Sequence, residues 1–304
     1  MKFILFYLCY GLLWLISLLP LRLLFVISDI LFFPVFYYLI PYRKKLVLKN
    51  LRNSFPEWDE KQILKTAKNF YHYFFDLLIE SNAGSFLGKR NMSKRYILKN
   101  PELCNELYEK GRSISLVMSH YGNWEWSAIS PLVLKHQVLA IYKPLNNHLV
   151  DKLFKKSRER FGVIAVPMEK ILRVLVNYES RHIPTLTFFL ADQRPLINII
   201  QYWLRFMNQE TPVVLGAEKI SRKMDMAVVY FRVMRVKRGY YEAEYVLLFE
   251  DAKNTEPYEI TKRYHEALEE TIRKKPEYWL WTHNRWKHKK SDFDRLFGNR
   301  EKMV

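Results

Sequence analysis

Hydrophobic residues follow two different patterns along the chain. Up to residue 40 they form long runs: Phe3 to Leu19 is almost wholly apolar, and a second apolar stretch extends from Leu23 to Ile40 around Asp29 and Pro34. Beyond residue 42, short apolar runs alternate with segments in which apolar residues recur at helical spacing. The first pattern is typical of a membrane-inserted segment, and the second is typical of a globular domain.

The N-terminal runs predict a membrane anchor over residues 1–41, made of transmembrane or interfacial helices. Phe3 to Leu19 has seventeen residues, at the short end of the length that spans a bilayer. A secretory signal is the alternative, because Lys2 precedes the run. No small-residue cleavage site follows, however, and more apolar sequence does, so a retained anchor is favoured. The number of passes and their depth stay open.

Positive charge increases sharply after the apolar region. Arg43, Lys44, Lys45, Lys49 and Arg52 follow it, whereas Lys2 alone precedes it. By the positive-inside tendency, the part over residues 42–304 is predicted to be cytoplasmic. The same cations also suit contact with acidic lipid headgroups.

Residues 42–304 predict one α/β domain. Asp59 and Gln62 form a capping box at the start of an amphipathic helix. Strands are expected over residues 113–119, 138–142, 163–166 and 185–190, with helices over residues 146–161 and 168–175 between them. Two β-rich runs, 227–236 and 240–249, flank a Lys-Arg-Gly turn and predict a hairpin, followed by a helix over 257–274. The order predicts a mixed, mostly parallel sheet flanked by helices.

Composition narrows the class of partner. The net charge is +18 and aromatic residues make up 16% of the chain, which favours an anionic partner and contact with a bilayer interface. Zinc-finger spacing and aromatic-basic RNA motifs are missing, so nucleic acid is not expected. Cys9 and Cys104 lie far apart and neither belongs to a metal-ligand spacing. No metal or other cofactor is expected.

The strongest candidate for chemistry is the end of the strand over residues 113–119. His120 follows this strand directly, and ligands of open α/β sheets bind beyond the carboxyl ends of strands. Histidine is the usual general base near neutral pH. Glu125 lies five residues further on, a spacing that does not share a helix face. We therefore expect a turn through Tyr121, Gly122 and Asn123, from which Glu125 reaches back, accepts the second imidazole N–H and fixes the tautomer.

The reaction class follows from what accompanies His120. No Gly-x-Ser-x-Gly elbow occurs in the sequence, so the histidine has no protein nucleophile to activate. Direct transfer is therefore predicted, in which an acceptor hydroxyl attacks an activated acyl carbonyl and nearby donors stabilise the oxyanion. Arg158 and Arg160 lie on a basic helix face with Lys155 and Lys156. This face is suited to lipid phosphates, or alternatively is simply solvated.

Several motifs together resemble the late acyltransferases of lipid A biosynthesis, the lauroyl/myristoyl transferase family, within the wider group that carries His-x4-Asp/Glu. The central one is SHYGNWEW, from Ser119 to Trp126. The others, in chain order, are NLRNSFPE (50–57), YKPLNN (142–147), RERFG (158–162), ADQ (191–193) and WLWTHNRWK (279–287). The resemblance covers nearly the whole chain and implies a fold like that of glycerolipid acyltransferases.

The resemblance implies acyl transfer from acyl-acyl carrier protein to a hydroxyl of a lipid A precursor, at the cytoplasmic face of the bacterial inner membrane. His120 and Glu125 match the catalytic pair. Asp192 and Gln193 match supporting residues, and Lys143 stands where the family usually has Arg, so an oxyanion or phosphate role there loses the bidentate fork. The remaining supporting candidates are Asn123, Arg158 and Arg160.

Two alternatives remain at this point. One keeps the chemistry but changes the acceptor to a lysophospholipid, an amino-lipid or a glycolipid. The other is a non-catalytic membrane protein that binds anionic lipid through its basic surface. The C-terminal tryptophans, Trp279, Trp281 and Trp286, are candidates for membrane contact or docking. His283 is expected to be structural, and Arg194 to serve either the site or a structural pair. Donor chain length and oligomeric state are not predicted.

Overall fold

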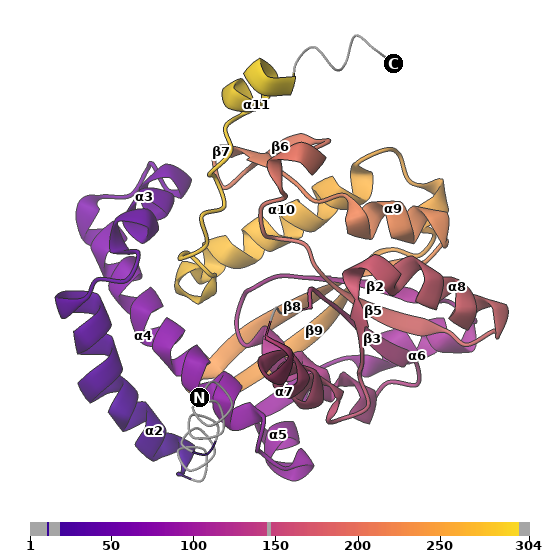
Figure 1. Cartoon of the computed structure of the whole chain (residues 1–304), viewed down its shortest axis with the longest axis horizontal. Coiled ribbons are helices and arrows are strands. Elements are labelled where there is room, and N and C mark those ends of the chain that lie inside the picture. Colours follow the sequence, from indigo (N-terminus) through magenta and orange to yellow (C-terminus); the bar gives the residue numbers. More distant parts are fainter. Residues whose placement is uncertain (1–10, 12–18, 145–146, 298–304) are drawn as a thin grey trace.

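The computed structural model describes residue 11 and residues 19–144 and 147–297. Its centre is a seven-stranded sheet with the strand order β1-β9-β8-β2-β5-β3-β4 (Figure 1). Every pair in this sheet is parallel except the β8–β9 hairpin. The strands are β1 Tyr96–Leu98, β2 Ile114–Met118, β3 Gln137–Tyr142, β4 Ile164–Pro167, β5 Thr185–Leu190, β8 Ala227–Lys237 and β9 Tyr240–Phe249. The predicted α/β class with a mixed, mostly parallel sheet is confirmed.

The central strand β2 shows why the sheet is covered on both sides. All five of its residues are buried. Val117 packs into one hydrophobic core, and Leu116 and Met118 pack into a second. Successive strand residues point to opposite faces, so a run that is apolar except for Ser115 fits a strand that is buried on both faces.

Helices form the two covering layers. Residues of α4 and α10 share the core that contains Val117, whereas residues of α2, α5 and α6 share the core that contains Leu116. A separate antiparallel hairpin, β6–β7, lies beside α10 (Figure 1). The elements are α2 Leu21–Ile27, α3 Lys44–Ser54, α4 Glu60–Gly84, α5 Lys89–Arg95, α6 Pro101–Glu109, the 3-10 helix η3 Trp124–Leu132, α7 His148–Glu159, α8 Ile171–Ser180, β6 Trp203–Phe206, β7 Gln209–Pro212, α9 Gly216–Lys223, α10 Glu259–Lys274 and α11 Lys290–Phe297.

The second apolar stretch forms a helical segment over Leu21–Leu39, made of α2 and the two π-helical turns η1 (Ser28–Phe32) and η2 (Val35–Leu39). It has 19 residues and a mean hydropathy of 1.7, long and apolar enough to cross a membrane. One side packs on α4, where the Phe33 ring stacks on His72 at 3.5 Å. The other side exposes large hydrophobic residues: Leu23, Val26, Ile30, Leu31, Tyr38 and Leu39. The predicted anchor over Phe3–Leu19 lies outside the described residues, apart from Gly11 and Leu19.

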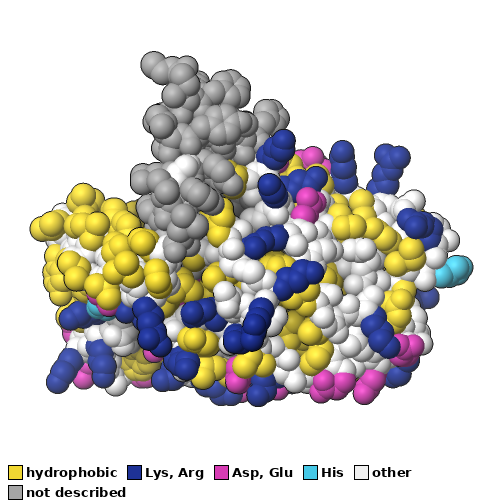
Figure 2. Space-filling view, turned by 90° about the horizontal axis from the view of Figure 1, so that it is seen from below, with side chains coloured by type: hydrophobic (Ala, Val, Ile, Leu, Met, Phe, Trp, Pro, Cys, Tyr) yellow, Lys and Arg dark blue, Asp and Glu magenta, His cyan; other side chains and the backbone are white. Residues whose placement is uncertain are grey.

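Figure 2 shows this exposed surface from one side. Hydrophobic side chains gather at the end of the molecule that the N-terminal segment covers, and Lys and Arg side chains border them. Apolar area of this kind, rimmed by cations, is typical of a surface that meets acidic lipid.

The start of α4 gives a stability prediction. Asp59 accepts a hydrogen bond from the backbone N–H of Gln62 at 2.7 Å, and the Gln62 side chain accepts one from the backbone N–H of Asp59 at 3.0 Å. Asp59→Ala removes the first contact and is expected to lower the free energy of unfolding by about 1 kcal/mol. Urea unfolding in detergent measures it. Lys61→Ala, in the same exposed turn, is the control, and an equal loss in both variants contradicts the prediction.

Candidate active site

His120 lies where two parallel strands end together. It follows β2 by two residues, and Asp192 follows the neighbouring strand β5 by two. Met118 and Leu190 are paired in register, and the backbone N–H of Ala191 donates to the carbonyl of Met118 at 3.2 Å. Parallel strands deliver their carboxyl ends to one edge of the sheet, which brings two residues 72 positions apart into contact.

Asp192 makes three hydrogen bonds from a position only 2% exposed. Its Oδ1 lies 2.7 Å from Nδ1 of His120, and its Oδ2 accepts from the backbone N–H of His120 at 3.0 Å and from Nε1 of Trp279 at 2.9 Å. Burial raises the pKa of Asp192, but the charge of His120 and these hydrogen bonds outweigh it and lower the pKa to about 2. The carboxylate is therefore ionised at neutral pH, and it accepts the hydrogen on Nδ1 of His120, which selects the tautomer.

The other ring nitrogen, Nε2, is thereby left as the proton acceptor. Nε2 lies 3.1 Å from the side-chain amide nitrogen of Gln193. The His120 ring also meets Trp124 edge-on, with the centroids 4.8 Å apart, and its side chain is 15% exposed. The histidine is held from three sides with one basic nitrogen near the surface, an arrangement suited to general base chemistry.

The prediction that Glu125 accepts the second imidazole N–H is wrong, because Asp192 makes that contact. Glu125 lies in the first turn of η3, and its Oε1 is 3.4 Å from Nη2 of Arg158. Both side chains are about one-third exposed. The turn after His120 directs Glu125 toward α7, whereas the topology of the sheet brings Asp192 beneath the imidazole. Whether Glu125 takes part in the chemistry stays a prediction.

The predicted turn between His120 and Glu125 is present and requires glycine. Gly122 has φ +59°, and an added Cβ would lie 2.6 Å from Cγ1 of Val233. Its carbonyl accepts a hydrogen bond from the hydroxyl of Tyr73 at 2.6 Å, and its N–H donates to the carbonyl of Tyr278 at 3.0 Å. The turn is therefore bonded on both sides to buried parts of the fold.

Asn123 is wholly buried and has a structural contact on each side-chain atom. Its Oδ1 accepts from the backbone N–H of Trp126 at 3.2 Å and caps η3. Its Nδ2 donates to Oε2 of Glu80 at 3.0 Å. The supporting role predicted for Asn123 therefore takes the form of holding the turn.

Glu80 begins a charge chain, buried at its α4 end and partly exposed at its other end, that the sequence did not predict: Glu80, Arg235, Asp76, Arg238 and Asp29. The nearest nitrogen–oxygen distances between successive members are 3.9, 2.7, 2.5 and 2.7 Å. It runs from the turn to the N-terminal apolar segment. Its members come from α4, the β8–β9 hairpin and residue 29. The available signal was two carboxylates four residues apart on the apolar side of the predicted helix after Asp59.

The predicted basic residues are separated by the fold. Arg158 lies beside Glu125, but Arg160 donates to the carbonyls of Gly84 and Phe86 and ties α7 to the end of α4. Lys143 is exposed just after β3, whose carboxyl end lies at the same edge of the sheet as His120. The phosphate role predicted for Arg160 is the least supported of the set.

Two of the three C-terminal tryptophans, Trp279 and Trp281, are buried in the fold, and Trp279 contacts Asp192. Trp279 and Trp281 are 3% and 0% exposed, and Nε1 of Trp286 donates to Oγ1 of Thr211. His283 accepts a hydrogen bond from the backbone N–H of Arg194, and burial lowers the pKa of His283 to about 4. The docking role considered for the tryptophans is therefore wrong for the two buried ones, and the structural reading of His283 fits its contact.

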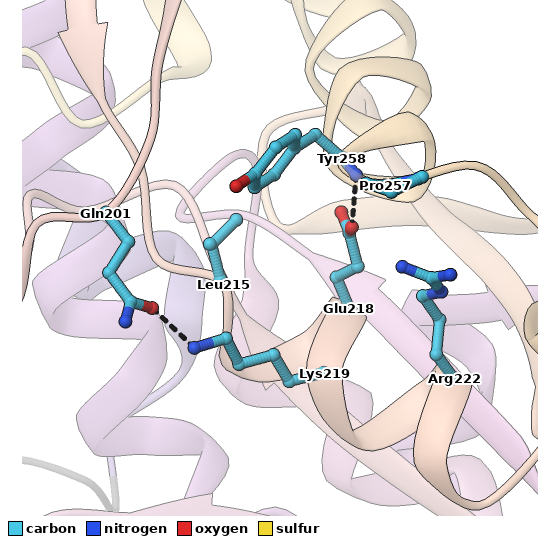
Figure 3. Close-up of a pocket in the computed structure, with 7 residues that line it drawn as sticks. All are labelled: Gln201, Leu215, Glu218, Lys219, Arg222, Pro257 and Tyr258. Carbon is cyan, nitrogen blue, oxygen red and sulfur yellow. Dashed lines mark hydrogen bonds between the residues drawn. The ribbon is translucent and has the colours of Figure 1, made fainter. Parts of the chain in front are cut away.

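A cavity of about 410 Å³ is lined mainly by α9 and by the residues just before α10 (Figure 3). It is beside α9, which leads into the start of β8, and β8 starts in register with Ile114 at the beginning of β2. Its acid, Glu218, accepts from the backbone N–H groups of Tyr258 and Thr261 and so holds the start of α10. Nζ of Lys219 donates a hydrogen bond to Oε1 of Gln201. The lining is occupied by structural contacts, and we assign it no chemistry. Among the described residues, no group of three His, Cys, Asp or Glu can hold a metal ion.

Two comparisons with known proteins agree. A family model described as bacterial lipid A biosynthesis acyltransferase matches residues 1–288. A lipid A biosynthesis acyltransferase of Haemophilus influenzae is 22% identical over 239 residues, which cover 76% of this chain and 72% of that relative.

The buried acid beside the turn gives a pH prediction. Burial raises the pKa of Glu80 from 4.5 to about 7, against the lowering effects of Arg235 and its hydrogen bonds. Between these two values the folded chain keeps a proton that the unfolded chain has released, so stability falls as pH rises through this window. Glu80→Gln, which cannot ionise, should remove a pH-dependent loss of as much as about 3 kcal/mol.

Urea unfolding at pH 5 and pH 8 measures this difference. The matched control is Glu102→Gln, since Glu102 is exposed in the first turn of α6. A Glu80→Gln variant that loses as much stability between the two pH values as the parent contradicts the assignment.

Proposed function

The chain belongs to the bacterial lipid A biosynthesis acyltransferase family, and from this premise we propose that it transfers a fatty acyl chain from acyl-acyl carrier protein to a hydroxyl of a lipid A precursor. The observation that carries the proposal is the contact between His120 and Asp192, which leaves Nε2 as the basic nitrogen. Family membership supports acyl transfer in lipid A synthesis. The donor, the base and the mechanism belong to the proposal.

In the proposed mechanism, His120 acts as a general base without a covalent acyl-enzyme. Nε2 takes the proton of the acceptor hydroxyl as its oxygen attacks the thioester carbonyl. The new carbon–oxygen bond forms, the carbon–sulfur bond breaks, and the imidazolium returns its proton to the departing thiolate. Asp192 stabilises the imidazolium and preserves the tautomer, the function first assigned to Glu125. Gln193 moves aside or orients the hydroxyl.

Positive charge at the rim of the site completes the proposal. Glu125 holds Arg158 at the rim, and Lys143 projects from the end of β3 at the same edge of the sheet. We assign these two cations to the oxyanion of the tetrahedral intermediate or to a phosphate of the acceptor. Arg158 is suited to bidentate contact, whereas Lys143 supplies a point charge.

The exposed hydrophobic residues and the positive charge of the surface support two further parts of the proposal, membrane attachment and docking of the donor. We assign residues 1–41 to membrane anchoring and residues 42–304 to the catalytic domain on the cytoplasmic face of the inner membrane. The exposed hydrophobic side of Leu21–Leu39 supports this assignment, as do the cations that follow residue 42. A net charge of +18 suits docking of an acidic carrier protein.

Removing the base or its partner should remove turnover while the chain stays folded. His120→Ala is expected to lower kcat by at least about 100-fold. Asp192→Asn should lower it by up to about 10⁴-fold, because the amide no longer fixes the hydrogen on Nδ1. Release of free thiol from acyl-acyl carrier protein, measured with purified protein in neutral detergent, reports the rate.

Arg181→Gln, an exposed change at the C-terminal end of α8, serves as the control for this assay. Circular dichroism confirms that each variant is folded. Near-parental turnover by folded His120→Ala would mean that another group is the base.

The acceptor is tested in cells. A strain lacking the protein should accumulate lipid A with one acyl chain fewer, seen by mass spectrometry. The parent sequence should restore the chain and His120→Ala should not. Unchanged lipid A, with a change instead in phospholipid, amino-lipid or glycolipid, would reject the lipid A precursor as acceptor while keeping acyl transfer.

A further inference from the structure

A second cavity, of about 380 Å³, lies where the N-terminal segment meets the β8–β9 hairpin. Its lining combines apolar walls with cations and contains no carboxylate. The lining residues are Leu21, Arg22, Phe25, Val26, Arg95, Lys237, Arg238 and Tyr240. Cations without acids, set among apolar walls, are the composition that an anionic amphiphile requires.

The cavity is built by a close approach of three elements. Gly239, in the hairpin turn, has φ +73°, and an added Cβ would lie 3.1 Å from the ring of Phe25 in α2 and 3.3 Å from Nη1 of Arg95 in α5. Nη1 of Arg95 donates to the carbonyl of Gly239 at 3.3 Å. Its guanidinium lies 4.7 Å from the ring centroid of Tyr240. The cavity is therefore a built feature of the fold.

The charges of the lining are not balanced locally. Arg238 is neutralised by Asp29 and Asp76 in the charge chain. Arg22, Arg95 and Lys237 have no Asp or Glu within ion-pair distance among the residues that the structure describes. The Lys237 ammonium lies instead 4.4 Å from the ring centroid of Tyr240. Three positive charges around one cavity lower the energy of an anion placed among them.

We propose that this cavity binds the phosphate headgroup of an anionic glycerophospholipid. Leu21 and Phe25 form buried apolar walls of the cavity, and the exposed Val26 leads from it to the exposed hydrophobic side of the N-terminal segment, where the acyl chains would lie. A free phosphate makes no use of these walls. The segment's apolar surface and the cations bordering it are visible at one end of the molecule (Figure 2).

This lipid site is separate from the acyl-transfer site. Val233 of β8 packs against Gly122 in the catalytic turn, and Lys237 lies four residues further along the strand. The lipid would therefore bind beyond the catalytic turn, beside the anchor. Its occupation stabilises the anchor against the hairpin and does not require the proposed reaction.

The test uses the full chain in neutral detergent micelles. Adding dioleoyl phosphatidylglycerol should raise the Tm of the parent by about 3 °C or more, and dioleoyl phosphatidylcholine should leave it unchanged. Native mass spectrometry should detect one retained phosphatidylglycerol. Arg95→Gln/Lys237→Gln should weaken the apparent lipid affinity at least about 10-fold, as expected for the loss of charge-assisted hydrogen bonds.

Two matched variants make the result specific. Lys170→Gln/Arg181→Gln removes the same charge from the distant α8 region and should keep parental affinity, which separates a site from diffuse attraction. Arg95→Lys/Lys237→Arg keeps the charge and should retain most of the binding, which excludes misfolding as the cause. Equal weakening in the hairpin and α8 variants overturns the proposal.

Two further readouts distinguish the alternatives. Displacement of phosphatidylglycerol by inorganic phosphate at equal concentration would mean that the cavity is a phosphate site, and would overturn the lipid assignment. Thiol release from acyl-acyl carrier protein in detergent without added phospholipid should be the same for the parent and Arg95→Gln/Lys237→Gln. If the parent binds phosphatidylglycerol as expected but transfers no acyl chain, the proposed function is rejected and the lipid site is retained.

Discussion

The fold depends on a group of buried carboxylates on α4 that are paired with arginines of the β8–β9 hairpin. Asp76 and Glu80 are 2% and 0% exposed, yet they lie on a helix that must pack against the sheet. Arg235 and Arg238 from the hairpin enter the same space. Removing one partner of such a group leaves an uncompensated buried charge, which costs about 3–5 kcal/mol. These contacts fix α4 against β8–β9, and α4 in turn holds the turn after His120.

The carboxylates of Asp192 and Glu125 occupy different environments, and each therefore interacts with a different side chain. Asp192 is shielded from water and receives three donors, so its charge acts on one imidazole at short range. Glu125 is partly exposed and faces Arg158 at 3.4 Å, where solvent weakens the attraction. The short motif that contains His120 thus supplies the base and a rim residue, and the partner of the base comes from the next strand of the sheet.

The local pattern of residue types correctly predicted those elements that depend on interactions between residues close in sequence. The strand over Thr185–Leu190, the hairpin and the capping box at Asp59 follow from residue type and spacing, and the structure has them. Contacts between neighbouring strands cannot be predicted from local pattern, because the sequence Ala191-Asp192-Gln193 does not indicate which strand lies beside it or that Asp192 contacts His120. The lipid A acyltransferase resemblance identified the family. The spacing of five residues, read as a turn, led to the wrong expectation that Glu125 accepts the imidazole N–H, a contact that Asp192 makes instead. The β6–β7 hairpin and α9 were missed because their segments are short and mixed in polarity.

The contact between Asp29 and Arg238 sets an order of events during synthesis. The apolar segment leaves the ribosome first, and the arginine that neutralises its carboxylate follows 209 residues later. At ordinary rates of translation this takes roughly 10–40 s. During that interval the nearer partner is His72 of α4, whose Nδ1 lies 3.7 Å from Oδ1 of Asp29 in the folded chain. The ion pair between Asp29 and Arg238 can therefore form only after the hairpin has been synthesised, whereas the contacts of the same segment with α4 involve residues made much earlier.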